Sequence, residues 1–239
     1  MKTLNIIHLF PKLLSLYGEY GNLAVLKLTL QSRGYTVNIH PYEMGEPDLS
    51  QADLVYMGSG TEDNLLEAVR RLMPHKEAIR ESIEKGTHWL VTGNAPAILG
   101  AAIEAKQTLP ALGLFPYTTK LNLTGRYLGD VLAKDKAGNT YVGFINTANA
   151  YTGMENPWLE LQLNPKLGND KASPSEGMTH RNLTATQLIG PILAKNPHLL
   201  YDLCTRLTGE EFAPEPQSNL CKAYEICLAQ LQNRLNAQS

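Results

Sequence analysis

The stretch that decides the fold is LVTGNAPAILG, residues 90–100. An apolar strand ending at Val91 turns tightly and enters a short helix built from small residues. Many α/β enzymes use this strand–turn–helix arrangement to place a nucleophile at the positive end of a helix. The turn here consists of Thr92, Gly93 and Asn94, without a cysteine or a serine. The sequence therefore predicts the backbone of a nucleophile elbow that lacks its usual nucleophile.

The residues before this turn alternate strand and helix patterns. Short apolar runs indicate strands buried on both faces of a parallel sheet, and leucines at helical spacing indicate the helices between them. Strands are expected at residues 5–10, 35–40, 53–57 and 88–91, and helices at 21–32 and 63–84, the latter kinked or split at Pro74. This alternation predicts an α/β fold with a doubly wound, mostly parallel sheet flanked by helices.

The pattern changes after Leu109. Residues 112–190 are richer in Gly, Asn, Thr and Tyr and contain short apolar runs, which favour added antiparallel strands. Residues 164–175 carry turn dipeptides and are expected to form a loop. A single domain is predicted over residues 1–239, with a parallel half at 1–108, mixed or antiparallel strands at 109–190, and C-terminal helices within 191–239, at 191–207 and 220–235.

Composition and charge exclude several classes of protein. At 239 residues the chain is long enough for a packed core, and a net charge of −2 disfavours a nucleic-acid binder. No apolar run reaches the roughly 18 residues that span a bilayer, and residues 1–10 resemble a buried first strand more than a signal peptide. Cys204, Cys221 and Cys227 follow no metal-binding spacing, so we expect reduced structural thiols, a cytoplasmic location, and no metal or cofactor.

Six short motifs occur in order along the chain, at Leu16–Asn22, Met57–Asp63, Ile98–Gly100, Arg126–Asp130, Gly143–Asn146 and Gly190–Pro197. Each is weak alone, but their order and spacing resemble those of class I glutamine amidotransferases of the CobB/CobQ type. The resemblance covers nearly the whole chain and is greatest for glutaminase subunits of the GatD type. It implies a flavodoxin-like amidotransferase fold and a partner subunit, the Mur-ligase-like ATPase MurT, which amidates a carboxylate of the cell-wall precursor lipid II.

The chain departs from this family at the catalytic positions. The family's elbow has the form Cys-Gly-Gly-Tyr-Gln-x-Leu-Gly, and its nucleophilic cysteine aligns with Gly93. The histidine of the family's His-Gly-Pro motif aligns with Ile189, and a Gly-Phe-Glu-Asn-His-Gly-Gly segment is replaced by Gly143–Asn149. In this family a thiolate attacks the glutamine amide while the histidine transfers a proton to the leaving ammonia. Gly93 has no side chain and Ile189 cannot carry a proton, so we expect glutaminase activity to be absent.

Other residues are poor replacements for this pair. Thr92 precedes the nucleophile position but would need a neighbouring base, and none is evident from the sequence. His180 lies nearest in sequence to the lost base and His88 begins the elbow strand, yet structural or surface roles are favoured for both. The three cysteines lie on predicted terminal helices, far in sequence from the elbow.

Several residues are nevertheless candidates for ligand binding, and they are Gly58, Ser59, Gly60, Asn94, Arg126 and Asn146. The glycine-containing turn has the place of the family's oxyanion-hole loop, whose backbone N–H groups bind a substrate oxygen; a purely steric need for glycine explains it equally well. The resemblance matches Arg126 to an arginine that grips a substrate carboxylate, and a surface arginine is the alternative. Asn94, Asn146, Asn149 and Tyr151 either line a remodelled polar pocket or are ordinary loop residues.

Three functions remain open. The favoured hypothesis is a catalytically degenerate subunit that serves as partner or scaffold of a MurT-like ligase, which then takes ammonia from another source. The second is an active glutaminase subunit with a non-standard nucleophile, which a glutamate-release assay detects. The third is a regulatory module that binds glutamine or another small carboxylate or amide, detectable as a shift in melting temperature.

Overall fold

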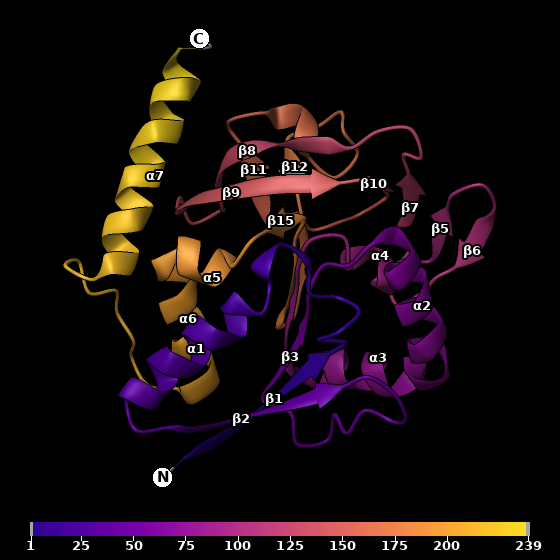
Figure 1. Ribbon diagram of the computed structural model, residues 1–239, viewed down its shortest axis with the longest axis horizontal. Coiled ribbons are helices and arrows are strands. Elements are labelled where there is room, and N and C mark those ends of the chain that lie inside the picture. Colours follow the sequence, from indigo (N-terminus) through magenta and orange to yellow (C-terminus); the bar gives the residue numbers. More distant parts are fainter. Residues whose placement is uncertain (1, 238–239) are drawn as a thin grey trace.

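A computed structural model describes residues 2–237, and its centre is a six-stranded sheet in the order β13-β14-β4-β3-β1-β2 (Figure 1). The pairs β1–β2, β1–β3, β3–β4 and β4–β14 are parallel, and β13 pairs antiparallel with β14 at one edge. The bounds of these strands are Thr3–Leu9 (β1), Thr36–Tyr42 (β2), Leu54–Met57 (β3), His88–Val91 (β4), Met178–His180 (β13) and Leu183–Ala185 (β14). The predicted doubly wound, mostly parallel sheet is confirmed.

Helices cover both faces of this sheet (Figure 1). On one face α1, α5 and α6 pack together and against strand side chains such as Tyr56 and Leu90. On the other face α2 and α3 cover Val55, Met57 and Trp89. Because apolar side chains are buried on both faces, the central strands are mostly apolar. The bounds are Gly21–Ser32 (α1), Glu62–Leu72 (α2), Met73–His75 (the 3₁₀ helix η2), Lys76–Lys85 (α3), Ile192–Lys195 (α5) and Pro197–Thr208 (α6).

The residues after the elbow add two smaller sheets, in the orders β10-β7-β5-β6 and β12-β11-β8-β9-β15. Their strands are Ala102–Glu104 (β5), Thr108–Pro110 (β6), Thr118–Leu121 (β7), Tyr127–Lys134 (β8), Thr140–Thr147 (β9), Asn149–Thr152 (β10), Leu159–Leu161 (β11), Ser175–Glu176 (β12) and Leu188–Ile189 (β15). The last helix, Asn219–Asn236 (α7), packs on β8 and β9 through Leu231. Among the helices of residues 2–237, none combines the length and apolar character that a membrane crossing requires.

The break at Pro74 and the added antiparallel strands are confirmed, but one detail of the sequence-based prediction is wrong. The helix expected at 191–207 is broken at Asn196, whose buried side chain bonds to the N–H and carbonyl of Val142 at 2.9 and 3.0 Å. Strand β14 pairs in parallel with β4 and antiparallel with β13, in keeping with the mixed or antiparallel strands expected at 109–190. The loop expected at 164–175 contains a 3₁₀ helix, Pro165–Leu167 (η3), and ends where β12 begins.

Candidate functional site

The predicted elbow lies at the carboxyl end of β4, where the chain leaves the parallel sheet. Gly93 adopts φ +69°, the left-handed conformation that a sharp strand-to-helix turn requires and that glycine tolerates. The helix that follows, Pro96–Leu99 (α4), is only four residues long, so the dipole behind the turn is small. Thr92, Gly93 and Asn94 are all buried. The backbone of an elbow is therefore present, and no part of it faces open solvent.

Three segments that are far apart in sequence meet at Gly93. A Cβ atom added to Gly93 would lie 2.5 Å from Ser59 Oγ, closer still to Ser59 Cβ, and 3.1 Å from Ile189 Cγ2. Ser59 is 1% exposed and Ile189 is 3% exposed. The positions that the resemblance assigns to the nucleophile, the oxyanion loop and the base thus lie together, and the side chains of Ser59 and Ile189 fill the space in front of the elbow.

Asn94 ties the elbow to the turn that follows β3. Its Oδ1 accepts hydrogen bonds from the Gly60 N–H at 3.0 Å and from the Ser59 hydroxyl at 3.1 Å. Its Nδ2 donates to the Gly60 carbonyl at 2.7 Å, and its own backbone N–H donates to Ser59 Oγ at 3.4 Å. The candidates Ser59, Gly60 and Asn94 are therefore brought together, and their polar groups bind one another.

The glycines of this turn have a steric role. A Cβ atom on Gly58 would lie 2.7 Å from the Leu14 carbonyl oxygen, and one on Gly60 would lie 2.6 Å from Leu14 Cδ2. The backbone of the turn is held in this position by a hydrogen bond of 2.9 Å from the Leu16 N–H to the Ser59 carbonyl. Close approach of two loops thus requires glycine here, whatever the turn binds.

A buried carboxylate that the sequence analysis missed adjoins the elbow. Glu19 follows the 3₁₀ helix Leu16–Gly18 (η1) and is 0% exposed. The hydroxyl of Thr92 donates to Glu19 Oε2, and the hydroxyl of Tyr56 donates to the same oxygen at 3.1 Å. Burial raises the pKa of Glu19 to about 7, although these two hydroxyls favour its ionised form. Thr92 therefore has a neighbouring base, which is the group it would need to act as a nucleophile.

The position of Glu19 within the Leu16–Asn22 motif was the available signal, since a carboxylate in a turn after a buried strand lies at the edge where the elbow ends. The Thr92 hydroxyl contacts Tyr56 at 3.1 Å, and Thr92 is 0% exposed. A substrate reaches this hydroxyl only if the packing around it opens.

Arg126 lies just before β8 and already has a carboxylate partner. Its Nη1 lies 2.8 Å from Glu62 Oε1, its Nε donates to Asn146 Oδ1 at 2.5 Å, and its Nη2 lies 3.5 Å from the Tyr17 hydroxyl. A cavity of about 390 Å³ opens beside this pair. A ligand carboxylate would have to displace Glu62 to form a bidentate contact with the guanidinium.

Asn149 and Tyr151 lie behind the elbow and are both buried. Asn149 Nδ2 donates to the Asn94 carbonyl at 3.1 Å and to the Tyr151 hydroxyl at 2.9 Å. Burial raises the pKa of Tyr151, so its hydroxyl stays protonated. Asn149 therefore binds the backbone of the elbow directly, and Tyr151 binds Asn149.

The histidines and cysteines weighed as replacements have other contacts. His180 Nε2 lies 2.8 Å from Glu84 Oε1, and His88 begins β4. The three cysteines lie on α6 and α7, where burial raises the pKa of Cys204 to about 12, so that thiol stays protonated. Within the described residues, no group of three or more His, Cys, Asp or Glu side chains is arranged to hold a metal ion.

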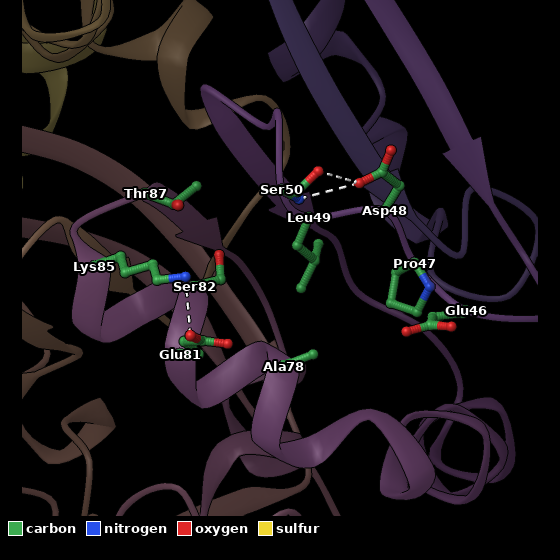
Figure 2. Close-up of a pocket in the computed structure, with 10 residues that line it drawn as sticks. All are labelled: Glu46, Pro47, Asp48, Leu49, Ser50, Ala78, Glu81, Ser82, Lys85 and Thr87. Atoms are coloured by element: carbon green, nitrogen blue, oxygen red, sulfur yellow. Dashed lines mark hydrogen bonds and ion pairs between the residues drawn. The ribbon is translucent and has the colours of Figure 1, made fainter.

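A separate cavity of about 500 Å³ lies between α3 and the loop before β3, at the amino ends of β3 and β4 (Figure 2). Three of its charged groups, Asp48, Glu81 and Lys85, have partners within its own wall. Asp48 Oδ1 accepts hydrogen bonds from the N–H and hydroxyl of Ser50, and Lys85 Nζ lies 2.9 Å from Glu81 Oε1. The elbow, at the other end of these strands, is where the predicted candidates gather.

The CobB/CobQ-like glutamine amidotransferase domain matches this chain over residues 5–197. Two relatives are similar over most of their length. The GatD subunit of lipid II isoglutaminyl synthase (glutamine-hydrolyzing) from Staphylococcus aureus (strain N315) is 28% identical over 232 residues, which cover 92% of this chain and 91% of that protein. The subunit of the same name from Streptococcus pneumoniae (strain ATCC BAA-255 / R6) is 26% identical over 231 residues, covering 95% and 88%.

Two solved structures share the fold. A crystal structure of a glutamine amidotransferase aligns with a TM-score of 0.56 and 14% identity, covering 85% of this chain and 99% of that one. The structure of PurLQS from Thermotoga maritima aligns with a TM-score of 0.55 and 13% identity, covering 97% of this chain and 100% of that one. At these identities the likeness concerns the fold alone.

Proposed function

Because this chain belongs to the family of CobB/CobQ-like glutamine amidotransferase domains, we propose that it is a GatD-like subunit without glutaminase activity. In this proposal it serves as partner or scaffold of a MurT-like ligase that amidates a carboxylate of a cell-wall precursor. The ligase then uses free ammonia, or ammonia from another source.

The packing of Ser59 and Ile189 against Gly93 carries the first part of the proposal. Amide hydrolysis of this class needs a nucleophile in front of the oxyanion donors and a base within reach of it. Gly93 offers no side chain, and Ile189 offers only carbon. The Ser59 hydroxyl, which lies beside this position, donates to the amide oxygen of Asn94, which is not a base.

Exposed side chains near Arg126 support a role in assembly. Tyr17 is 39% exposed and contacts Arg126, and Leu123 and Leu128 on the neighbouring segment are 57% and 61% exposed. Tyrosine and arginine are enriched in protein interfaces, and exposed apolar side chains gain stability when a partner covers them.

Co-expression with the Mur-ligase-like protein of the same cell tests the proposal. We expect a complex on size-exclusion chromatography and amidation that depends on added ammonium salt, at a rate unchanged by glutamine. Failure to associate, or amidation that requires glutamine, contradicts it.

A second candidate function, an active glutaminase with a non-standard nucleophile, is favoured by the contact between Thr92 and Glu19. Glu19 would accept the proton of the Thr92 hydroxyl as that oxygen attacks the amide carbon, and would return it to the leaving ammonia. Incubation with an electrophilic glutamine analogue, followed by peptide mapping, tests this function. An adduct on Thr92 that is lost in Glu19→Gln supports it, and an unmodified residue 88–100 peptide excludes it.

A further inference from the structure

We infer that the side-chain carboxamide of Asn94 occupies the amide-binding position of this site, so that the protein carries its own internal amide ligand. The inference rests on the proposed function only in that it concerns the same elbow. Beyond that function, we infer that the hydrogen bonds between Asn94 and Gly60 close the site, and that the site would bind a primary carboxamide once the Asn94 side chain is removed.

The hydrogen bonds of Asn94 form a closed pair with one peptide unit of the turn after β3. Gly60 donates its N–H to Asn94 Oδ1 at 3.0 Å and accepts from Asn94 Nδ2 at 2.7 Å through its carbonyl. Asn94 is 2% exposed, so both bonds are protected from water. A free primary amide in the same place would make the same two bonds.

The backbone donors of the elbow are both occupied by internal acceptors. An oxyanion hole is built from N–H groups aimed at a substrate oxygen, here those of Gly60 and of Asn94, the residue after the nucleophile position. The first donates to Asn94 Oδ1 at 3.0 Å and the second to Ser59 Oγ at 3.4 Å. A substrate amide oxygen therefore has to compete with two groups that are held in place by the fold.

The turn itself has little room to move away from Asn94. Leu14 and Leu13 lie against Gly60, since a Cβ atom there would be 2.6 Å from Leu14 Cδ2 and 2.7 Å from the Leu13 carbonyl oxygen. The side chain of Asn64 donates to that same Leu13 carbonyl at 3.0 Å, which fixes the loop further. Removal of the Asn94 side chain is therefore the direct way to expose the Gly60 peptide.

The same geometry selects the chemical class of ligand. The Gly60 carbonyl accepts from an N–H₂ group, and a carboxylate offers it only a second acceptor oxygen, which it would repel. The opened site should therefore bind a primary carboxamide in preference to the matching carboxylate. Acetamide against acetate, and L-glutamine against L-glutamate, are matched probes.

Hydrogen exchange of the Gly60 amide, followed by NMR on glycine-labelled protein, tests the inference in the natural sequence and in Asn94→Gly. We expect this amide to be protected in the natural sequence and to exchange about tenfold faster or more in Asn94→Gly, the factor expected for the loss of one hydrogen bond. A Gly60 amide that exchanges like an exposed loop amide in the natural sequence overturns the inference.

Titration completes the test. In Asn94→Gly, and in Ser59→Gly/Asn94→Gly, acetamide and L-glutamine should shift the NMR signal of the Gly60 amide, while acetate should not. In the natural sequence none of these three compounds should shift it. Asn149→Ala is the matched control, because it removes a buried amide that contacts the Asn94 backbone but not Gly60. Equal responses of the natural sequence and Asn94→Gly, or none in a folded Asn94→Gly protein, contradict the inference.

These outcomes are independent of the proposed function. Glutamine hydrolysis by the natural sequence would refute the absence of glutaminase activity, whatever Gly60 does. Loss of ligase binding would refute the assembly role and leave the exchange result unaffected. Only the Gly60 amide and the carboxamide titration decide the role of Asn94.

Discussion

Replacing Gly93 with cysteine and Ile189 with histidine places at these positions the two catalytic side chains that the resemblance assigns to them, yet we expect this double variant to be unstable and inactive. A β-carbon at residue 93 lies 2.5 Å from Ser59 Oγ, and overpacking of this kind costs about 1–3 kcal/mol. The φ of +69° adds about 1–3 kcal/mol for any residue other than glycine. The sum, about 2–6 kcal/mol, is a large part of the roughly 5–15 kcal/mol that stabilises a typical domain.

A third change, Ser59→Gly, removes the atoms that the new β-carbon meets. The clash is then relieved, and about 1 kcal/mol is lost with the hydrogen bond from Ser59 to Asn94. The triple variant should therefore be more stable than the double variant, and it is the one in which glutamate release from glutamine is worth measuring.

Urea unfolding of alanine variants separates the two costs in unfolding free energy, that of the steric clash with Ser59 and that of the positive φ. Gly93→Ala should incur both costs. Gly34→Ala should incur only the cost of the positive φ, because Gly34 has φ +83° and nothing lies within 4 Å of its added Cβ. We expect Gly93→Ala to cost about 1–3 kcal/mol more than Gly34→Ala, and Ser59→Gly to recover much of the difference. Equal losses in the two alanine variants, without recovery by Ser59→Gly, refute the claim that Ser59 fills the nucleophile space.

Three further predictions concern stability. Burial raises the pKa of Glu19 from 4.5 to about 7, so its contribution to the free energy of unfolding is complete below pH 4.5 and is lost as the pH rises through 7. In urea titrations Glu19→Gln should reduce this fall by up to about 1.4 kcal/mol per pH unit and leave the similar fall that Glu176 causes. An unchanged dependence of the unfolding free energy on pH contradicts the assignment. Asn196→Ala should cost about 2–4 kcal/mol with an unchanged urea dependence, since it leaves buried backbone groups of β9 without partners; a loss below 1 kcal/mol argues against that role. Arg126→Gln should change the free energy of unfolding by less than about 1 kcal/mol, because Arg126 and Glu62 are 37% and 34% exposed, and a larger loss means that the pair holds the fold.

The sequence predicted the central elements well because their signals are local. The helix at Gly21–Ser32 and the strand at His88–Val91 have the predicted bounds, since leucine spacing and a continuous apolar run determine them. Pro74 marked the break between α2 and α3 for an equally local reason, its missing N–H. The break at Asn196 also has a local cause, since Pro197 begins α6 without a backbone N–H, but the contact of Asn196 with Val142, 54 residues away in the chain, could not be predicted from the sequence.

The candidate site could be predicted only in part for the same reason. The resemblance pointed to Gly58, Gly60, Gly93, Asn94 and Ile189 as positions of one site, and the structure brings them to one place. What the space contains depends on contacts across the sheet, between Ser59 and Gly93 and between Glu19 and Thr92. No periodicity or spacing within the chain encodes those contacts, so the filled pocket and the contact between Glu19 and Thr92 were found only in the structure.

Glutamate release from L-glutamine by the purified 239-residue chain, measured by mass spectrometry over hours, tests whether the elbow supports glutamine hydrolysis. We expect glutamate at the level of the buffer alone, with and without the ligase partner, and the same level in Thr92→Val. Glutamate formed above that level in the natural sequence and lost in Thr92→Val or Glu19→Gln would contradict it.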